Sequence, residues 1–129
     1  MAAILVDSTF YIAQQRAGRD VRRMVGPWLI GGLLWNCGVI RAEVLRGVIK
    51  PKIKQDWIEF FDLLPNVETG EQLWREASEL AWTLDRQGLV LPLTDIVVAC
   101  CALRESALLI STDKHFWQVP GLRVQEDLP

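Results

Sequence analysis

The stretch that decides the fold reads TDIVVACCALRESALLISTD (residues 94–113). Its first half predicts a helix from Asp95 to about Arg104 that is apolar on nearly every side, with Thr94 able to cap its start. Its second half, residues 107–110, is a continuous apolar run, which is typical of a strand covered on both faces. A buried helix followed directly by a buried strand indicates an α/β protein.

The alternation of strands and helices continues outward from this stretch. A short apolar run at residues 3–6 ends at Asp7, where a helix capped by Asp7 or Ser8 is expected to begin. This order predicts a three-layer α/β/α sandwich with a short, mostly parallel sheet, and residues 1–129 are expected to form a single domain. The other predicted elements are helices at residues 20–33, 36–49, 52–61 and 71–86, a helical turn at 114–117, and strands near 63–67, 89–91 and 122–124.

Composition limits the classes of protein that the chain can belong to. Half of the 129 residues are hydrophobic, and 14 basic against 16 acidic residues give a formal charge of −2, so no overall basic excess points to nucleic acid. The basic residues are nevertheless concentrated in the first half of the chain. They form two clusters that suit either a solvated helix face or contact with phosphates: Arg16, Arg19, Arg22 and Arg23, and then Arg46, Lys50, Lys52 and Lys54.

The cysteines and the N-terminal sequence indicate the cellular compartment in which the protein is expected. Cys37, Cys100 and Cys101 make an odd number with no CxxC spacing, which argues against both a disulfide framework and a zinc site. The N-terminal apolar run meets Asp7 before it could form a signal peptide. We expect buried free thiols in a cytoplasmic protein.

One segment, residues 24–40, resembles a membrane span at first sight because Asn36 is its only strongly polar residue. It is shorter than the roughly 20 residues that a bilayer requires, and it contains Pro27 and several glycines. We therefore expect two short buried helices, the second capped by Asn36, and no membrane association. Part of this apolar stretch, including Trp28 and Trp35, is expected to form a protein interface, for example in a homodimer.

Three carboxylates are predicted to lie where strands give way to helices. Asp7 follows residues 3–6, Asp95 follows the apolar run at 89–93, and Asp113 follows residues 107–110. Such junctions meet at the carboxyl edge of a parallel sheet, so the three side chains are expected to converge, although each alone could simply cap a helix.

Glu43 is the fourth candidate, because helical spacing places it on the same face as Val39 and Ile40. An isolated carboxylate is costly to bury there, unless Arg46 forms an ordinary pair with it on the helix surface. A pocket of carboxylates without thiolates suits Mg²⁺ or Mn²⁺ better than zinc, and such sites hydrolyse phosphodiesters.

Four motifs occur in order along the chain: ILVDST (residues 4–9), AEVLRG (42–47), TDIVVA (94–99) and LISTDKHF (109–116). Together they resemble the PIN domain family, in particular the VapC-type toxin ribonucleases. The resemblance implies a Mg²⁺- or Mn²⁺-dependent endoribonuclease that acts on RNA, is commonly a homodimer, and is held inactive by a cognate antitoxin protein. The segment WNCG (35–38) departs from the family pattern, which bears on local helix packing rather than on the acids.

The resemblance also implies roles for individual residues. The family's acidic metal-binding set maps onto Asp7, Glu43, Asp95 and Asp113. Its small hydroxyl residue maps onto Ser111, which would orient a carboxylate or a water molecule.

Other interpretations remain open at this point. A catalytically silent PIN-like interaction module would share the fold, and a phosphohydrolase could use Asp7 as a nucleophile, although Thr9 breaks the DxD pattern of that class. His115, the only histidine, is expected to have a surface or packing role rather than to act as a general base. Most of the six tryptophans are expected in the core or an interface rather than stacked on bases.

Overall fold

The computed structural model describes residues 1–129 and contains one sheet of five short strands in the order β3-β2-β1-β4-β5. All four neighbouring pairs are parallel, which confirms the predicted sheet. Parallel strands have their carboxyl ends at one edge, so the residues that follow them gather there. The strands are β1 (Ile4–Val6), β2 (Leu34–Cys37), β3 (Asn66–Val67), β4 (Leu108–Ile110) and β5 (Val124–Gln125).

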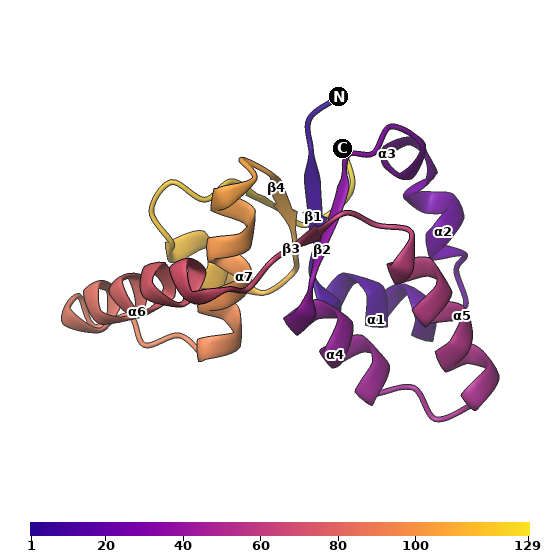
Figure 1. Ribbon diagram of the computed structural model, residues 1–129, viewed down its shortest axis with the longest axis horizontal. Coiled ribbons are helices and arrows are strands. Elements are labelled where there is room, and N and C mark those ends of the chain that lie inside the picture. Colours follow the sequence, from indigo (N-terminus) through magenta and orange to yellow (C-terminus); the bar gives the residue numbers. More distant parts are fainter.

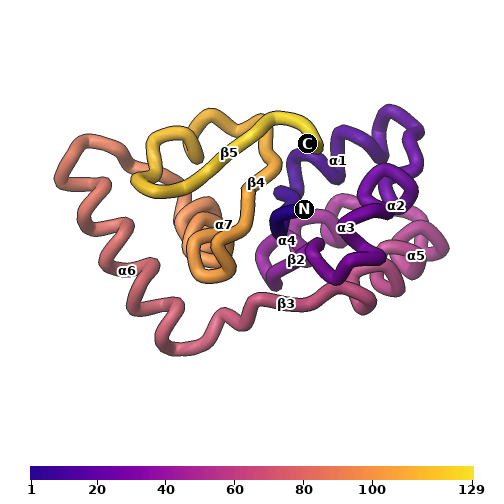
Figure 2. The backbone as a smooth tube through the Cα atoms, turned by 90° about the horizontal axis from the view of Figure 1, so that it is seen from above, coloured from indigo at the N-terminus to yellow at the C-terminus, as the bar shows by residue number.

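Helices cover both faces of the sheet, which confirms the three-layer sandwich. Helices α1 to α5 lie on one side and α6 and α7 on the other (Figure 1), and the view from above shows the same division, with α6 outermost (Figure 2). The helices are α1 (Ser8–Arg16), α2 (Val21–Met24), α3 (Gly26–Ile30), α4 (Gly38–Arg46), α5 (Pro51–Asp62), α6 (Glu71–Arg86), α7 (Leu93–Arg104) and the 3₁₀ helix η1 (Lys114–Gln118).

The centre of the molecule is the pair β1 and β4 together with α7. Every residue of β1 is buried, and Leu5 pairs with Leu109 in the parallel ladder. In α7, residues 96–102 are all buried, as their apolar character predicted. The three free cysteines are buried as well, which agrees with the expected thiols.

The start of α7 differs from the prediction. Residues 89–91 form no strand, and the helix begins at Leu93 with Pro92 in the capping position, so Thr94 caps nothing. The backbone of Pro92 is extended, with φ −54° and ψ 142°, so the helical conformation starts only at the next residue. Asp95 therefore lies in the first turn of α7 rather than after a strand.

The largest error of the prediction concerns residues 34–37, which were expected to form a two-residue junction and the start of the second of two helices, and which instead form β2. The expected helix over residues 20–33 divides into α2 and α3, and Gly32, with a φ of 68°, turns the chain into the strand. Asn36 caps no helix: it lies within β2, and its backbone N–H donates to the carbonyl of Pro65 at 3.0 Å. The expected helix over residues 36–49 is α4, which begins at Gly38.

The apolar stretch over residues 24–40 contributes mainly to the core. Val25, Trp28, Leu34 and Ile40 are buried within it, and Ile30 is the large apolar side chain that it exposes. Trp28 is therefore unavailable as an interface residue in this conformation. No helix of the chain combines the length and apolar character needed to cross a bilayer.

Replacing Trp28 with Glu is expected to lower the free energy of unfolding by about 3 kcal/mol or more, because it removes a buried ring and buries a charge. Trp28 is only 8% exposed, whereas Ile30, two residues away, is 89% exposed. The control Ile30→Glu is expected to change stability by no more than about 0.5 kcal/mol. Urea denaturation of both variants checks this, and equal stability of the two would contradict the packing described here.

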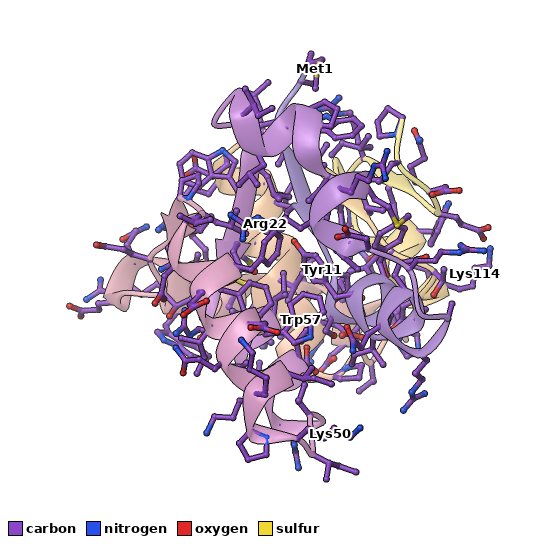
Figure 3. The ribbon with its side chains drawn as sticks, turned by 90° about the vertical axis from the view of Figure 1, so that its right-hand side faces the viewer. Met1, Tyr11, Arg22, Lys50, Trp57 and Lys114 are labelled. Atoms are coloured by element: carbon purple, nitrogen blue, oxygen red, sulfur yellow. The ribbon has the colours of Figure 1, made fainter.

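An aromatic cluster fixes α1, and with it the residues that follow β1. The Tyr11 ring lies 5.5 Å from Trp57 and 5.6 Å from Phe61 of α5, edge to face in both pairs. Figure 3 shows Tyr11 and Trp57 close together between the helices. The packing of α1 against α5 therefore holds the first turn of α1 at the carboxyl edge of the sheet.

Candidate functional site

Asp7 lies where β1 ends and α1 begins, and only 3% of it is exposed. It occupies the N-cap position of α1, but its side chain makes no capping hydrogen bond. Instead, its Oδ2 atom accepts hydrogen bonds from the hydroxyls of Thr9, at 2.7 Å, and Ser111, at 2.9 Å. Two neutral donors thus hold a buried carboxylate on one oxygen and leave Oδ1 available to a ligand.

Ser111 links the carboxyl ends of β1 and β4 at this edge through its side chain. It follows β4 and is fully buried. Its Oγ donates to Asp7 and accepts the backbone N–H of Asp113 at 3.0 Å. One hydroxyl therefore sets the position of Asp7 relative to Asp113.

Asp113, Asp95 and His115 form the most compact group of possible metal ligands. The Nδ1 atom of His115 lies 3.2 Å from Oδ2 of Asp95 and 3.3 Å from Oδ1 of Asp113. Asp113 also accepts the backbone N–H of His115 at 3.0 Å and so caps η1. One ligand atom from each of the three residues lies within 4.8 Å of the others.

Glu43 reaches the same edge from α4. It is half-buried, and its Oε1 accepts a hydrogen bond from the Ser8 hydroxyl at 3.1 Å. Burial raises the pKa of Glu43, the Ser8 hydrogen bond opposes that shift, and the negative charge of Asp7 adds to it. Arg46 forms no ion pair with Glu43, so the ordinary helix-surface pair is not observed.

The site carries concentrated negative charge with no lysine or arginine partner, and His115 is the one basic side chain in contact with it. None of the five ion pairs made by lysine or arginine involves Asp7, Glu43, Asp95 or Asp113. Burial raises the pKa of Asp95, and the charges of Asp113 and Asp7 add to this shift while His115 opposes it. A site of this kind disfavours its own ionised form until a cation enters.

The structure therefore brings all five residues singled out in the sequence to one edge of the sheet, in two linked groups. Asp95 and Asp113 share the compact group with His115, and Ser111 connects that group to Asp7. Two residues went unrecognised: the Thr9 hydroxyl, and the imidazole of His115, for which the sequence favoured a surface or packing role. A hydroxyl two residues after a strand-ending Asp was a usable signal for Thr9, whereas the approach of His115 to Asp95 depends on the tertiary fold.

A family model for the PIN domain matches residues 4–122. The chain belongs to the PIN domain family. The matched span contains every carboxylate of the site, so this PIN domain carries its acidic residues within the region that defines the family.

Solved structures share the fold of this PIN domain at low sequence identity. A chain of the DNA-bound VapBC complex from Salmonella typhimurium superposes with a TM-score of 0.80 at 16% identity, over 97% of this chain and 98% of that chain. A chain of VapBC2 from Rickettsia felis, bound to a promoter DNA fragment, gives a TM-score of 0.79 at 18% identity, over 95% and 97%. VapBC-5 from Mycobacterium tuberculosis, a member of the VapBC family of toxin-antitoxin systems, gives 0.63 at 17% identity, over 97% of both chains. A comparison with curated proteins finds no matching relative.

Proposed function

We propose that this PIN domain is a Mg²⁺- or Mn²⁺-dependent endoribonuclease and the toxin of a toxin-antitoxin pair in the cytoplasm. The observation that carries the proposal is the gathering of Asp7, Glu43, Asp95 and Asp113 at one edge of the sheet, where Ser111 links Asp7 to Asp113, the charge of Asp7 acts on both Glu43 and Asp95, and no lysine or arginine forms an ion pair with the acids. Membership of a family of nucleases supports the reaction class.

The donor set fits a divalent cation. Carboxylate oxygens are the ligands that Mg²⁺ and Mn²⁺ prefer, and no lysine or arginine forms an ion pair with them here. In the proposal, Asp7, Asp95, Asp113 and Glu43 hold the ion. When bound, a divalent cation polarises the phosphodiester and generates a nucleophile from water at neutral pH.

Each residue then has a task of its own. Ser111 and Thr9 hold Asp7 on a single oxygen, so that the other oxygen faces the ligand. Ser8 aims Glu43 toward Asp7. The half-buried Glu43 accepts the Ser8 hydrogen bond on Oε1, which leaves its other oxygen for the ion.

Basic residues near the same helices support RNA as the substrate. Arg16, Arg46 and Lys50 are exposed, form no ion pair, and lie at or just beyond the far ends of α1 and α4, the helices that carry Ser8 and Glu43. Figure 3 shows Lys50 at the outer end of α5, away from the core. These charges can hold the phosphates of a strand whose scissile bond lies at the acids.

An antitoxin protein is the proposed partner, because the similar folds come from VapBC complexes. Formation of a homodimer is proposed with it. Light scattering of the chain alone, and then with the product of an adjacent small reading frame, tests both associations.

Metal removal is the direct test of the proposed reaction. The purified chain is expected to cleave several RNAs internally with Mg²⁺ or Mn²⁺, and EDTA is expected to reduce cleavage to background, because the carboxylates cannot act without the ion. Mn²⁺ is also expected to raise the melting temperature, since it binds only the folded site. Cleavage that persists in EDTA, or no cleavage with either metal, would instead favour a catalytically silent interaction module.

A further inference from the structure

The side chain of His115 enters the acidic site, although none of the roles assigned to the acids and to Ser111 requires it. We propose that Nδ1 of His115 is a direct ligand of the divalent cation, beside Asp95 and Asp113, and that it makes this site favour Mn²⁺ over Mg²⁺. The inference rests on the metal-dependent function proposed above and adds a nitrogen ligand to it.

The distances suit one ion shared by three ligand atoms. In an octahedral site with bonds of about 2.1 Å, adjacent ligand atoms lie about 3.0 Å apart. Nδ1 of His115 is 3.2 Å from the Asp95 oxygen and 3.3 Å from the Asp113 oxygen. Both distances from Nδ1 are within a few tenths of an ångström of that spacing, and all three ligand atoms lie within 4.8 Å of one another.

The orientation of the ring also suits coordination. Nδ1 faces two carboxylate oxygens, whereas the ring as a whole is 48% exposed and Nε2 has no hydrogen-bond partner in the protein. A neutral imidazole can carry its proton on one nitrogen and bind a metal through the other. Here Nε2 can keep the proton toward solvent, and Nδ1 can turn its lone pair to the ion.

A nitrogen ligand changes which ion the site prefers. Carboxylates alone suit Mg²⁺. An imidazole nitrogen adds affinity for first-row transition-metal ions, a series that begins with Mn²⁺ and does not include Mg²⁺. His115 thus gives Mn²⁺ an advantage that the four carboxylates do not supply.

The experiment uses the tag-free full chain with Mn²⁺ as the probe, because Mn²⁺ is paramagnetic. His115 is the only histidine in the sequence, so an imidazole ¹⁴N signal in pulsed EPR of bound Mn²⁺ can come from no other residue. The wild-type chain is expected to show this signal. In His115→Asn the signal should vanish, the Kd for Mn²⁺ should rise at least about tenfold, and the Kd for Mg²⁺ should change less than about threefold.

The His115→Asn substitution distinguishes coordination of the metal by the side chain at position 115 from positioning of Asp95 by that side chain. The asparagine side-chain amide can still hydrogen-bond Asp95, but an amide nitrogen does not replace the imidazole as a ligand. The matched control is Lys114→Gln, because the Lys114 ammonium bonds Glu126 at 2.6 Å and points away from the acids. This variant should keep the ¹⁴N signal and the affinity for Mn²⁺.

Each outcome decides the inference. Bound Mn²⁺ without imidazole coupling, or an unchanged Mn²⁺ affinity in His115→Asn, would show that the ring only occupies the position of the ion in its absence. In that case, Mg²⁺-dependent cleavage by the wild-type chain would still support the nuclease. If the wild-type chain neither binds Mn²⁺ nor cleaves RNA with Mg²⁺, both the inference and the proposed function fail.

Discussion

Asp7→Asn is expected to reduce metal-dependent RNA cleavage by about 10³-fold or more while leaving the fold intact. The substituted asparagine would keep an oxygen to accept the Thr9 and Ser111 hydrogen bonds, so the junction of β1 and α1 retains its packing. It would replace the free carboxylate oxygen with an amide nitrogen, which cannot bind a cation. Several kcal/mol of charge stabilisation in the transition state depend on that ion, and each 1.4 kcal/mol is a factor of about ten in rate.

The measurement is the initial rate of RNA cleavage in Mg²⁺, together with the urea midpoint. Asp85→Asn is the matched control, because it makes the same change of charge on an exposed position of α6 that forms no ion pair. Cleavage by Asp7→Asn within about tenfold of the control would remove Asp7 from the metal site.

Glu43→Gln is the second substitution with a large expected effect, a loss of cleavage of about 10²-fold or more. The change keeps the shape and the acceptor for Ser8, and it removes only the charge and the ability to take a proton. Cleavage and growth inhibition are measured beside Glu79→Gln, an exposed residue of α6. Full activity or an unfolded protein would show that Glu43 is structural.

The same variant is expected to be more stable than the wild-type chain in EDTA at neutral pH. Because the pKa of Glu43 is raised in the folded state, its ionised form costs stability there, and this cost develops as the pH rises from the unfolded pKa to the folded one. Glutamine avoids the cost. The advantage should therefore disappear below the ordinary glutamate pKa, at about pH 4, and denaturation midpoints at the two pH values check it.

Elements with a strong periodic or apolar pattern were predictable from the sequence. Helix α6 was placed at its observed bounds, and β1, β4 and the buried face of α7 lie where their apolar runs indicated. The failure at β2 has a physical cause, because its four residues, three apolar and one Asn, are too few to show the periodicity that distinguishes a buried strand from a buried helix. Pairing with β1 and β3 settles the choice, and no local pattern encodes that pairing.

The same distinction applies to the candidate site, where residues marked by a local pattern could be predicted and residues placed by tertiary packing could not. The acids could be found because the ends of parallel strands share an edge, even though Asp95 reaches that edge from a helix rather than from the strand expected before it. The place of His115 in the site depends on how η1 is set against α7, and neighbouring Phe116 and Trp117 suggested packing instead. The contact of Thr9 with Asp7, two residues earlier, had a local signal, whereas its contact with Ser111, which is distant in the chain, had none.

The bond between Ser111 and Asp7 spans 104 residues of sequence, and this separation has a consequence for protein synthesis. At about 5–20 residues per second, a ribosome takes on the order of 5–20 s to pass from one to the other. Throughout that interval the nascent chain carries Asp7 without Asp113, Glu43 and Asp95 are added only partway through it, and β1 has no complete β4 beside it. The growing polypeptide therefore lacks a complete acidic cluster, and under the proposed function the RNA being translated meets an active nuclease only after β4 has emerged and paired with β1.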